Sequence, residues 1–147
     1  MAHRDLKTFN FDNVAAAVNG VLVSGLWEGD DVITIEQNSP LTNNIVGAGG
    51  DVLISVSTDK ATKVTLKLQH VSETHAALTA LLIQYEQGNP SLFSFACNDV
   101  GTGEGGGAGE CVLMDKPTVG FGAQATVREW TFFCANWESN NVTYNGL

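Results

Sequence analysis

Basic side chains are scarce in this sequence, which carries seven Lys and Arg against sixteen Asp and Glu and a net charge of −9. A protein that binds duplex nucleic acid needs a basic surface to neutralise the phosphates. The sequence therefore argues against direct nucleic-acid binding. Charged residues of both signs make up only 16% of the chain. Much of the surface must then consist of Ser, Thr, Asn, Gln and Gly, which suits contacts with other proteins as well as with water.

Long apolar segments and cysteine pairs are also lacking. No apolar run approaches the roughly 20 residues of a membrane-spanning helix, so we expect no stable membrane insertion. Residues 1–7 contain no apolar segment of the secretory-signal kind. The three cysteines, Cys97, Cys111 and Cys134, form no C-x-x-C motif. We therefore expect reduced thiols in a cytoplasm and no zinc site.

Motifs for catalysis are missing or incomplete. The glycine-rich stretch 101–109 lacks the Lys of a phosphate-binding loop and carries Glu104, which would repel phosphate; it is interpreted as a flexible hairpin tip. His70, Glu73 and His75 do not have the spacing that places two His on one helical face. We therefore assign no catalytic residue, no metal ligand and no cofactor, and expect the protein not to be an enzyme.

The length and apolar content that are present suffice for a folded domain. The chain has 147 residues, of which 44% are hydrophobic. A chain of this size buries roughly 70% of its unfolded surface. We expect a single domain over residues 1–147, with a polar C-terminal tail from about residue 138.

Alternating apolar residues predict about seven strands. Asn19-Gly20 joins two β-prone segments and favours a type I′ hairpin turn. We also expect a second hairpin, in which residues 51–58 pair with residues 64–70. Further strands are expected over residues 31–37, 92–97, 111–114 and 124–137.

One segment has helical rather than strand periodicity. Ser72 is a candidate N-cap, and Leu78, Leu81, Leu82 and Tyr85 recur at helical spacing. We expect a helix over about residues 72–86. The predicted fold class is mainly β, a β-sandwich or barrel with one flanking α-helix.

Residues 38–50 form a long connection between two predicted strands. Long loops in compact domains are usually functional or disordered. This one carries apolar side chains among polar ones, which indicates docking onto another surface. The residues that we expect to make this contact are Leu41, Thr42, Asn43, Asn44, Ile45 and Val46.

Acidic residues and tryptophans are two further features of the sequence. Glu28, Asp30, Asp31 and Glu36 lie in and after a turn, and we expect them to form an acidic surface. The three tryptophans at positions 27, 130 and 137 are read as core residues, with a sugar-binding platform as the less favoured alternative.

The order of several short motifs resembles that of bacteriophage tail tube proteins. The motifs are Val21-Leu-Val-Ser-Gly-Leu-Trp-Glu-Gly-Asp-Asp31, Gly47-Ala-Gly-Gly-Asp51, the strand from Val64 through Ser72 into a Leu-rich helix, and Arg128-Glu-Trp130. Each motif is weak alone, but the four occur in the family's order across residues 10–135. The loop after Asn98 is richer in Gly than is usual for the family.

This resemblance implies a structural virion protein of a long-tailed, contractile-tailed phage, related in fold to type VI secretion tube proteins. Homohexameric rings would stack into a helical tube, and DNA would pass through its lumen into the host without specific binding. Glu28, Asp30, Asp31 and Glu36 would then face the lumen or another ring surface. Expected partners are the tail sheath, baseplate and terminator proteins, with assembly in the bacterial host cytoplasm.

Two other functions are compatible with the sequence. A tail terminator, or another tail-associated ring protein, could share the fold but would remain a single ring. A secreted carbohydrate-binding β-sandwich would use the tryptophans, and should carry a secretion signal.

Overall fold

The computed structural model describes residues 9–142, and the fold is mainly β with one flanking helix, as the sequence predicts. Ten strands are formed by the described residues, three more than expected. The elements are, in chain order, η1 (Phe11–Asn13), β1 (Val14–Val18), β2 (Val21–Leu22), β3 (Ile33–Gln37), β4 (Thr42–Val46), β5 (Val52–Val56), β6 (Thr62–Gln69), α1 (Glu73–Glu86), β7 (Phe93–Asp99), β8 (Gly105–Asp115), β9 (Val127–Cys134) and β10 (Glu138–Ser139).

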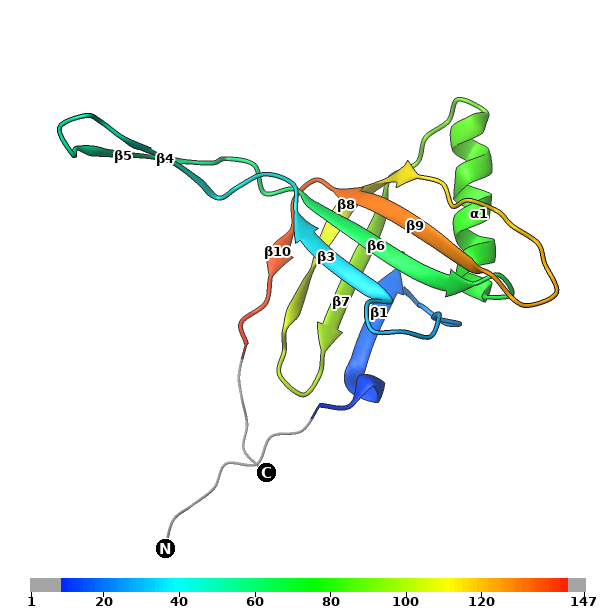
Figure 1. Ribbon diagram of the computed structural model, residues 1–147. Coiled ribbons are helices and arrows are strands. Elements are labelled where there is room, and N and C mark those ends of the chain that lie inside the picture. The colour runs from blue at the N-terminus through cyan, green and yellow to red at the C-terminus, as the bar shows by residue number, and fades with distance from the viewer. Residues whose placement is uncertain (1–8, 143–147) are drawn as a thin grey trace, which may run out of the picture.

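Eight of the strands form one antiparallel sheet that folds back on itself (Figure 1). Its order is β2-β1-β7-β8-β9-β6-β3, and β10 pairs with β8. Strand β8 makes the bend: its first half pairs with β7 and its second half with β9, with a register shift in each pairing. Such irregularities increase the local twist of a strand. The result is a sandwich in which β1, β7 and the start of β8 face β3, β6 and β9.

The hydrophobic core fills the space between the two halves of the sheet. Phe132 of β9 meets Phe93 of β7 edge-on, with ring centroids 5.1 Å apart. Burying such aromatic and aliphatic side chains is the main source of folding free energy. The fully buried apolar residues are Val64, Leu66, Leu68, Leu78, Cys111, Trp130, Phe132 and Cys134.

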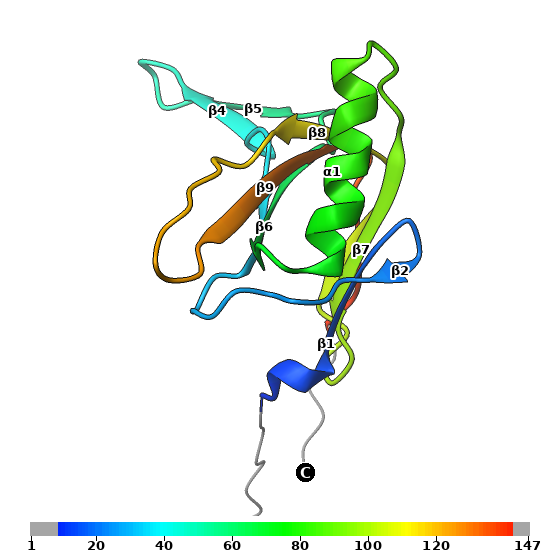
Figure 2. The ribbon, with the colours of Figure 1, turned by 90° about the vertical axis from the view of Figure 1, so that its right-hand side faces the viewer.

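Helix α1 begins where the sequence predicts and is fastened to the sheet at its first turn. The hydroxyl of Ser72 accepts hydrogen bonds from the backbone N–H groups of Thr74 and His75, which is the geometry of an N-cap. The same hydroxyl donates to the carbonyl of Ser24 at 2.6 Å. Gly25, with φ +67°, allows this close approach, because a Cβ there would lie 2.7 Å from the Cβ of Ser72. Figure 2 shows α1 covering one side of the body.

The predicted Asn19-Gly20 hairpin is confirmed, whereas the second predicted hairpin is wrong. Asn19 and Gly20 both adopt positive φ between the paired strands β1 and β2. Residues 52–56 do form a strand, but β5 pairs with β4 and not with β6. Strand β6 instead pairs with β3 and β9. Residues 38–50 are therefore not a plain loop, because they contain β4.

The glycine-rich stretch is also more ordered than expected. It was predicted to be a flexible tip, but Gly105, Gly106 and Gly107 begin strand β8. Their lack of a side chain has a steric reason. A Cβ on Gly106 would collide with the carbonyl oxygen of Glu138 and lie 2.7 Å from the indole nitrogen of Trp137. The glycines thus let the C-terminal segment lie directly on the sheet.

Part of the polar C-terminal tail pairs with the main sheet. Within residues 138–142, Glu138 and Ser139 pair with Gly107 and Gly106 as β10; residues 143–147 of the predicted tail lie outside the described residues. In the part of the chain that the structure describes, no helix has the length and apolarity required to cross a membrane.

Candidate functional site

The hairpin of β4 and β5 extends away from the body, on the side opposite to α1 (Figure 1). We call residues 41–57 the arm. All ten residues of its two strands are exposed. Its large apolar side chains, each at least 55% exposed, are Leu41, Ile45, Val46, Val52, Leu53, Ile54 and Val56. A two-stranded hairpin alone in water is marginally stable at best, and the exposed apolar side chains of the arm are available for contact with another surface.

The apolar side chains of the arm lie on both of its faces. The register pairs Val46 with Val52 and Asn44 with Ile54, which places four β-branched residues on one face: Val46, Val52, Ile54 and Val56. Ile45 and Leu53 form a cross-strand pair on the other face. An ordinary surface hairpin would present polar residues on at least one face.

The base of the arm is fixed by Asp59. Its carboxylate accepts hydrogen bonds from the Ser39 hydroxyl at 2.7 Å, the Asn38 side-chain amide at 2.8 Å and the Ala61 backbone N–H at 2.8 Å. These three bonds, from Ser39 first, then Asn38 and Ala61, lower the pKa of Asp59 below its ordinary value. Because they join both ends of the arm, they fix the direction in which it leaves the body.

All six residues assigned to the contact from the sequence, 41 to 46, lie in the first half of the arm. The sequence analysis missed the second half, which contributes Val52, Ile54 and Val56, because their alternation was taken to mean a strand of the main sheet. Leu53, between Val52 and Ile54, was a usable signal. It makes both faces of this strand apolar, which does not suit a strand with one solvated face.

Two of the four predicted acidic residues line a cleft between β3 on one side and η1, β1 and the end of β7 on the other. This acidic cleft has a volume of about 1030 Å³, and its apolar floor includes Val32, Ile33 and Ile35. Its carboxylates are Glu28, Asp30, Asp99 and Glu104. The last two were not predicted, because they come from the distant β7–β8 turn and only the folding of the sheet brings them near the others.

The other two predicted acids do not line this cleft. Asp31 is exposed and directly follows Asp30 in the sequence. Glu36 lies on β3 directly across from Lys63 of β6, with Oε1 and Nζ 3.8 Å apart. Both side chains are largely exposed, so this ion pair adds little stability. It does cancel one negative charge on the outer face of the sheet, where Lys67 also lies opposite Glu129.

Trp130 and His75 have structural roles. Trp130 is fully buried and donates from Nε1 to Nδ1 of His75 at 3.0 Å. Burial lowers the pKa of His75, with smaller contributions from the nearby charges of Arg128 and His70. Because Trp130 is inaccessible, the three tryptophans do not form one exposed sugar-binding platform. No three His, Cys, Asp or Glu side chains within residues 9–142 are placed to hold a metal ion.

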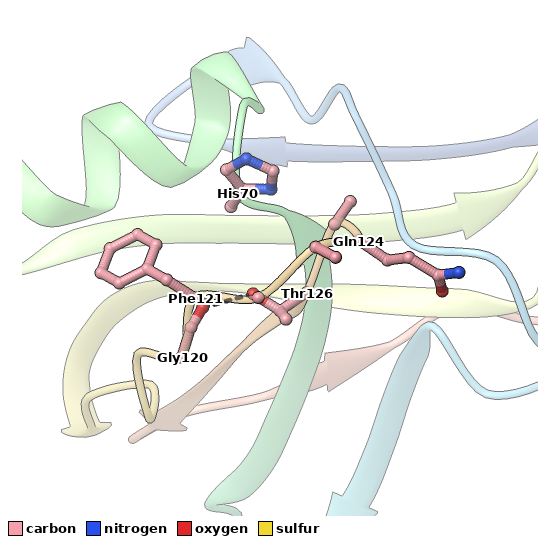
Figure 3. Close-up of a pocket in the computed structure, with 8 residues that line it drawn as sticks. His70, Gly120, Phe121, Gln124 and Thr126 are labelled. Atoms are coloured by element: carbon pink, nitrogen blue, oxygen red, sulfur yellow. Dashed lines mark hydrogen bonds between the residues drawn. The ribbon is translucent and has the colours of Figure 1, made fainter.

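A second polar feature is the loop before β9, which surrounds a pocket beside His70 (Figure 3). Arg128 is only 2% exposed and donates to the Gly120 carbonyl at 3.1 Å and to the Thr126 hydroxyl. Thr126 in turn donates to Gly120. The exposed ring of Phe121 lies over the guanidinium, 5.5 Å from its carbon. The hydrogen bonds of the buried Arg128 guanidinium thus stabilise the loop.

The three cysteines are free and buried. Cys111 and Cys134 face each other across β8 and β9, with their sulfur atoms 2.9 Å apart. The hydrogen bond between them, together with burial, raises the pKa of Cys134, and burial raises the pKa of Cys97. The same hydrogen bond lowers the pKa of Cys111. All three side chains are buried and pack in the hydrophobic core.

Comparison with solved structures shows the same fold in components of contractile injection systems. The chain is similar to the tube-terminating cap of the anti-feeding prophage, with a TM-score of 0.61 and 10% identity over 96% of each chain. It is similar to the sheath/tube terminator of the extracellular contractile injection system PVC, with a TM-score of 0.55 and 14% identity over 90% of this chain and 96% of that one. A chain of the PVC sheath-tube complex gives a TM-score of 0.52 and 12% identity over 95% and 93%.

Comparison with sequences points to the same group of proteins. No curated protein sequence matches the chain. The family model described as "Bacteriophage PhiTE tail tube protein" matches residues 6–141, nearly the whole chain. The matched family is a structural one rather than an enzyme family. The chain therefore belongs to the PhiTE tail tube protein family and is a component of the virion tail.

Proposed function

We propose that this chain, as one domain over residues 1–147, is the subunit of a tail tube: copies assemble into hexameric rings, and the rings stack into a hollow tube that conducts DNA into the host. The observation that carries this proposal is the arm. It presents seven large apolar side chains to solvent, and exposed apolar surface of this extent marks a protein interface. The first strand of the arm, residues 41–46, serves as the inter-subunit or inter-ring contact.

The edges of the main sheet support assembly of identical copies. Within the described residues, β3 and β2 are the end strands, each paired on one side only. Free strand edges promote uncontrolled pairing between chains unless they are covered. A ring in which the sheets of neighbouring copies join into one barrel removes this hazard. Such head-to-tail contacts close into a ring when the rotation between copies is right.

The charge of the chain suits a channel that DNA passes through without binding. Each copy has a net charge of −9. Glu28, Asp30 and Asp31, with Asp99 and Glu104, form an acidic surface of the ring, and Glu36 offsets Lys63. The carboxylates that line the acidic cleft repel DNA phosphates rather than bind them. Replacing Glu28 and Asp30 by Lys should increase DNA retention by assembled tubes at low salt; unchanged retention would argue against a lumenal position of these acids.

Partners follow from the same role. The tube is enclosed by a sheath, starts on a baseplate and ends at a terminator, in a contractile tail that assembles in the host cytoplasm. The solved structures of similar fold include a sheath-tube complex and two tube terminators. Buried, reduced cysteines suit assembly in a reducing compartment.

Electron microscopy of the purified chain tests the proposal. The arm can be removed without disturbing the body, because its strands are adjacent at the base, where Ser57 N–H donates to the Leu41 carbonyl at 2.8 Å. Replacing residues 42–56 by Asn-Gly closes this base with a two-residue turn. The wild-type chain should form tubes, whereas the shortened chain should keep its thermal unfolding temperature and form none. Normal tubes from the shortened chain would refute the role of the arm.

A tail terminator is the second candidate, because two of the structures with the same fold are terminators. A terminator forms a single ring on the end of the tube and does not polymerise. Microscopy at high protein concentration separates the two roles. Isolated rings without tubes would favour the terminator, and tubes of many rings would favour the tube subunit.

A further inference from the structure

A second apolar surface lies at the other side of the body from the arm. It is a groove of about 270 Å³ between α1 and the β1–β2 hairpin, which we call the helix groove. Val21 and Leu22, at 71% and 69% exposure, form one wall, and Ala77, Ala80 and Leu81 of the helix form the other. Small residues on the helix leave room for side chains that enter from outside.

The helix groove differs from the acidic cleft in its charge. Of the described residues that line the helix groove, Glu73 alone is charged. The acidic cleft is lined by four carboxylates. Two copies of a chain with a net charge of −9 repel each other, so contacts between copies are most favourable where neither surface carries much charge.

The arm is the matching surface on the same chain. Between residues 41 and 57 its one charged residue is Asp51, at the tip. One face carries Val46, Val52, Ile54 and Val56, all at least 60% exposed. A nearly uncharged ridge of β-branched side chains thus occurs together with a nearly uncharged apolar groove.

The positions of the two surfaces determine which copy can dock. The arm leaves the body on the side away from α1 (Figures 1 and 2), so it points away from the helix groove of its own chain. A contact between two different patches is heterologous, and repetition of such a contact produces a ring or a filament rather than a closed dimer. The arm of each copy then contacts one neighbour, and its helix groove receives the arm of another neighbour.

We infer that the β-branched face of the arm docks into the helix groove of the next copy of the chain. This inference rests on the proposed tube function and specifies the contact through which copies join. The apolar face of the arm becomes covered by a neighbour, and the exposed Val21 and Leu22 become covered in the same step. Burial of these aliphatic side chains provides the free energy of the contact.

Single glutamate substitutions test the two halves of the contact. Leu22→Glu and Ala80→Glu each place a charge in the helix groove, and Ile54→Glu places one on the arm. Ala80 is exposed on α1 and Glu is a good helix former, so this variant should fold normally. Val100→Glu is a matched control, because Val100 is as exposed as Leu22 but lies at the β7–β8 turn. We expect loss of tubes for the first three variants and normal tubes for the control.

A mixing experiment then shows whether the two surfaces meet each other. The Ile54→Glu chain has an intact helix groove, and the Ala80→Glu chain has an intact arm. Each alone should sediment as a smaller species than wild type. An equimolar mixture should form complexes that contain both variants, because the arm of one and the helix groove of the other are intact; these complexes should be larger than those of either variant alone in analytical ultracentrifugation and should not continue into tubes.

The possible outcomes separate the two proposals. Wild-type protein that forms no higher assembly at any concentration would overturn the tube function itself. Wild-type tubes together with normal tubes from Leu22→Glu and Ala80→Glu would overturn the docking inference and leave the tube function standing. Absence of any larger complex in the mixture, with both single variants defective, would show that arm and groove contact different partners.

Discussion

Strands β5 and β6 have similar sequences but lie in opposite environments. Val52, Ile54 and Val56 alternate along β5 just as Val64, Leu66 and Leu68 alternate along β6. The first three are 60% to 76% exposed, whereas the last three are fully buried. The difference lies in their neighbours, because β6 is flanked by β3 and β9 within the sandwich and β5 pairs with β4 alone. Alternating apolar residues predict a strand. They do not show whether the apolar face packs within the same chain or against another chain.

The same substitution in the two regions should change the free energy of unfolding by very different amounts, and this is the largest expected difference. Leu66→Ala empties a fully buried position and should reduce the free energy of unfolding by about 2–5 kcal/mol. Leu53→Ala, at 62% exposure in the arm, should change it by less than about 0.5 kcal/mol. Urea unfolding of dilute, unassembled protein measures both. A similar loss in the two variants would mean that the arm is packed within its own chain.

Glycines of strand β8 provide a second comparison within the body. Gly106→Ala forces a methyl group against Trp137 and Glu138 and should destabilise the protein by about 1–3 kcal/mol. Gly109 lies in the same strand, and a Cβ there meets nothing within 4 Å. Gly109→Ala should therefore be neutral or stabilise by up to about 1 kcal/mol. Thermal unfolding distinguishes them, and equal effects would show that Trp137 does not lie tightly on this strand.

Mild acid should lower the stability of the protein, because His75 becomes protonated. Its pKa is lowered from the ordinary 6.5 because it is partly buried, so the folded state takes up a proton less readily than the unfolded chain. The associated stability is complete above pH 6.5 and falls as the pH drops toward the lowered pKa of the folded state. Thermal unfolding temperatures should decrease over this range in the wild type and less so in His75→Gln.

The smallest expected effect concerns the base of the arm. Asp59→Ala removes the acceptor for Ser39, Asn38 and Ala61 and should lower the unfolding temperature only slightly, because these hydrogen bonds are exposed or only partly buried. It should slow tube formation, because the direction of the arm is no longer fixed. Light scattering measures the rate, with Asp51→Ala at the arm tip as the control.

Acid should have the same effect on this base in the wild type. The lowered pKa of Asp59 means that the hydrogen bonds persist above the ordinary carboxyl value of 3.8 and weaken as the pH falls through the lower folded value. A rate of assembly that is equal in wild type and Asp59→Ala would show that other contacts orient the arm.

Local signals in the sequence predicted the elements better than their partners. Ser72 and Asn19-Gly20 were recognised because capping and turn chemistry depend on a few adjacent residues. The pairing of β5 with β4 was missed because the polar Asn43 and Asn44 hid the alternation of β4. The glycines of β8 were taken for a flexible tip because their reason, the approach of Trp137, comes from a segment about thirty residues away.

The candidate site shows the same limit. Residues 41–46 were identified because an apolar group in a long polar connection is visible in the sequence. The helix groove was not, because it forms only when α1 lies beside β2, and neither element carries an unusual composition. The acidic cleft was half predicted: Glu28 and Asp30 are near in sequence, whereas Asp99 and Glu104 join them only through the folding of the sheet.

The composition of the arm makes its cleavage by proteases a simple measure of assembly. Residues 41–57 contain no Lys, Arg or aromatic residue, so trypsin has no cleavage site within the arm in any state. Elastase cleaves after small aliphatic residues, which the arm has in abundance, and a free hairpin opens often enough to be cut. The ratio of elastase cleavage in dilute protein to that in tubes would therefore measure the fraction of arms that are covered by a neighbour.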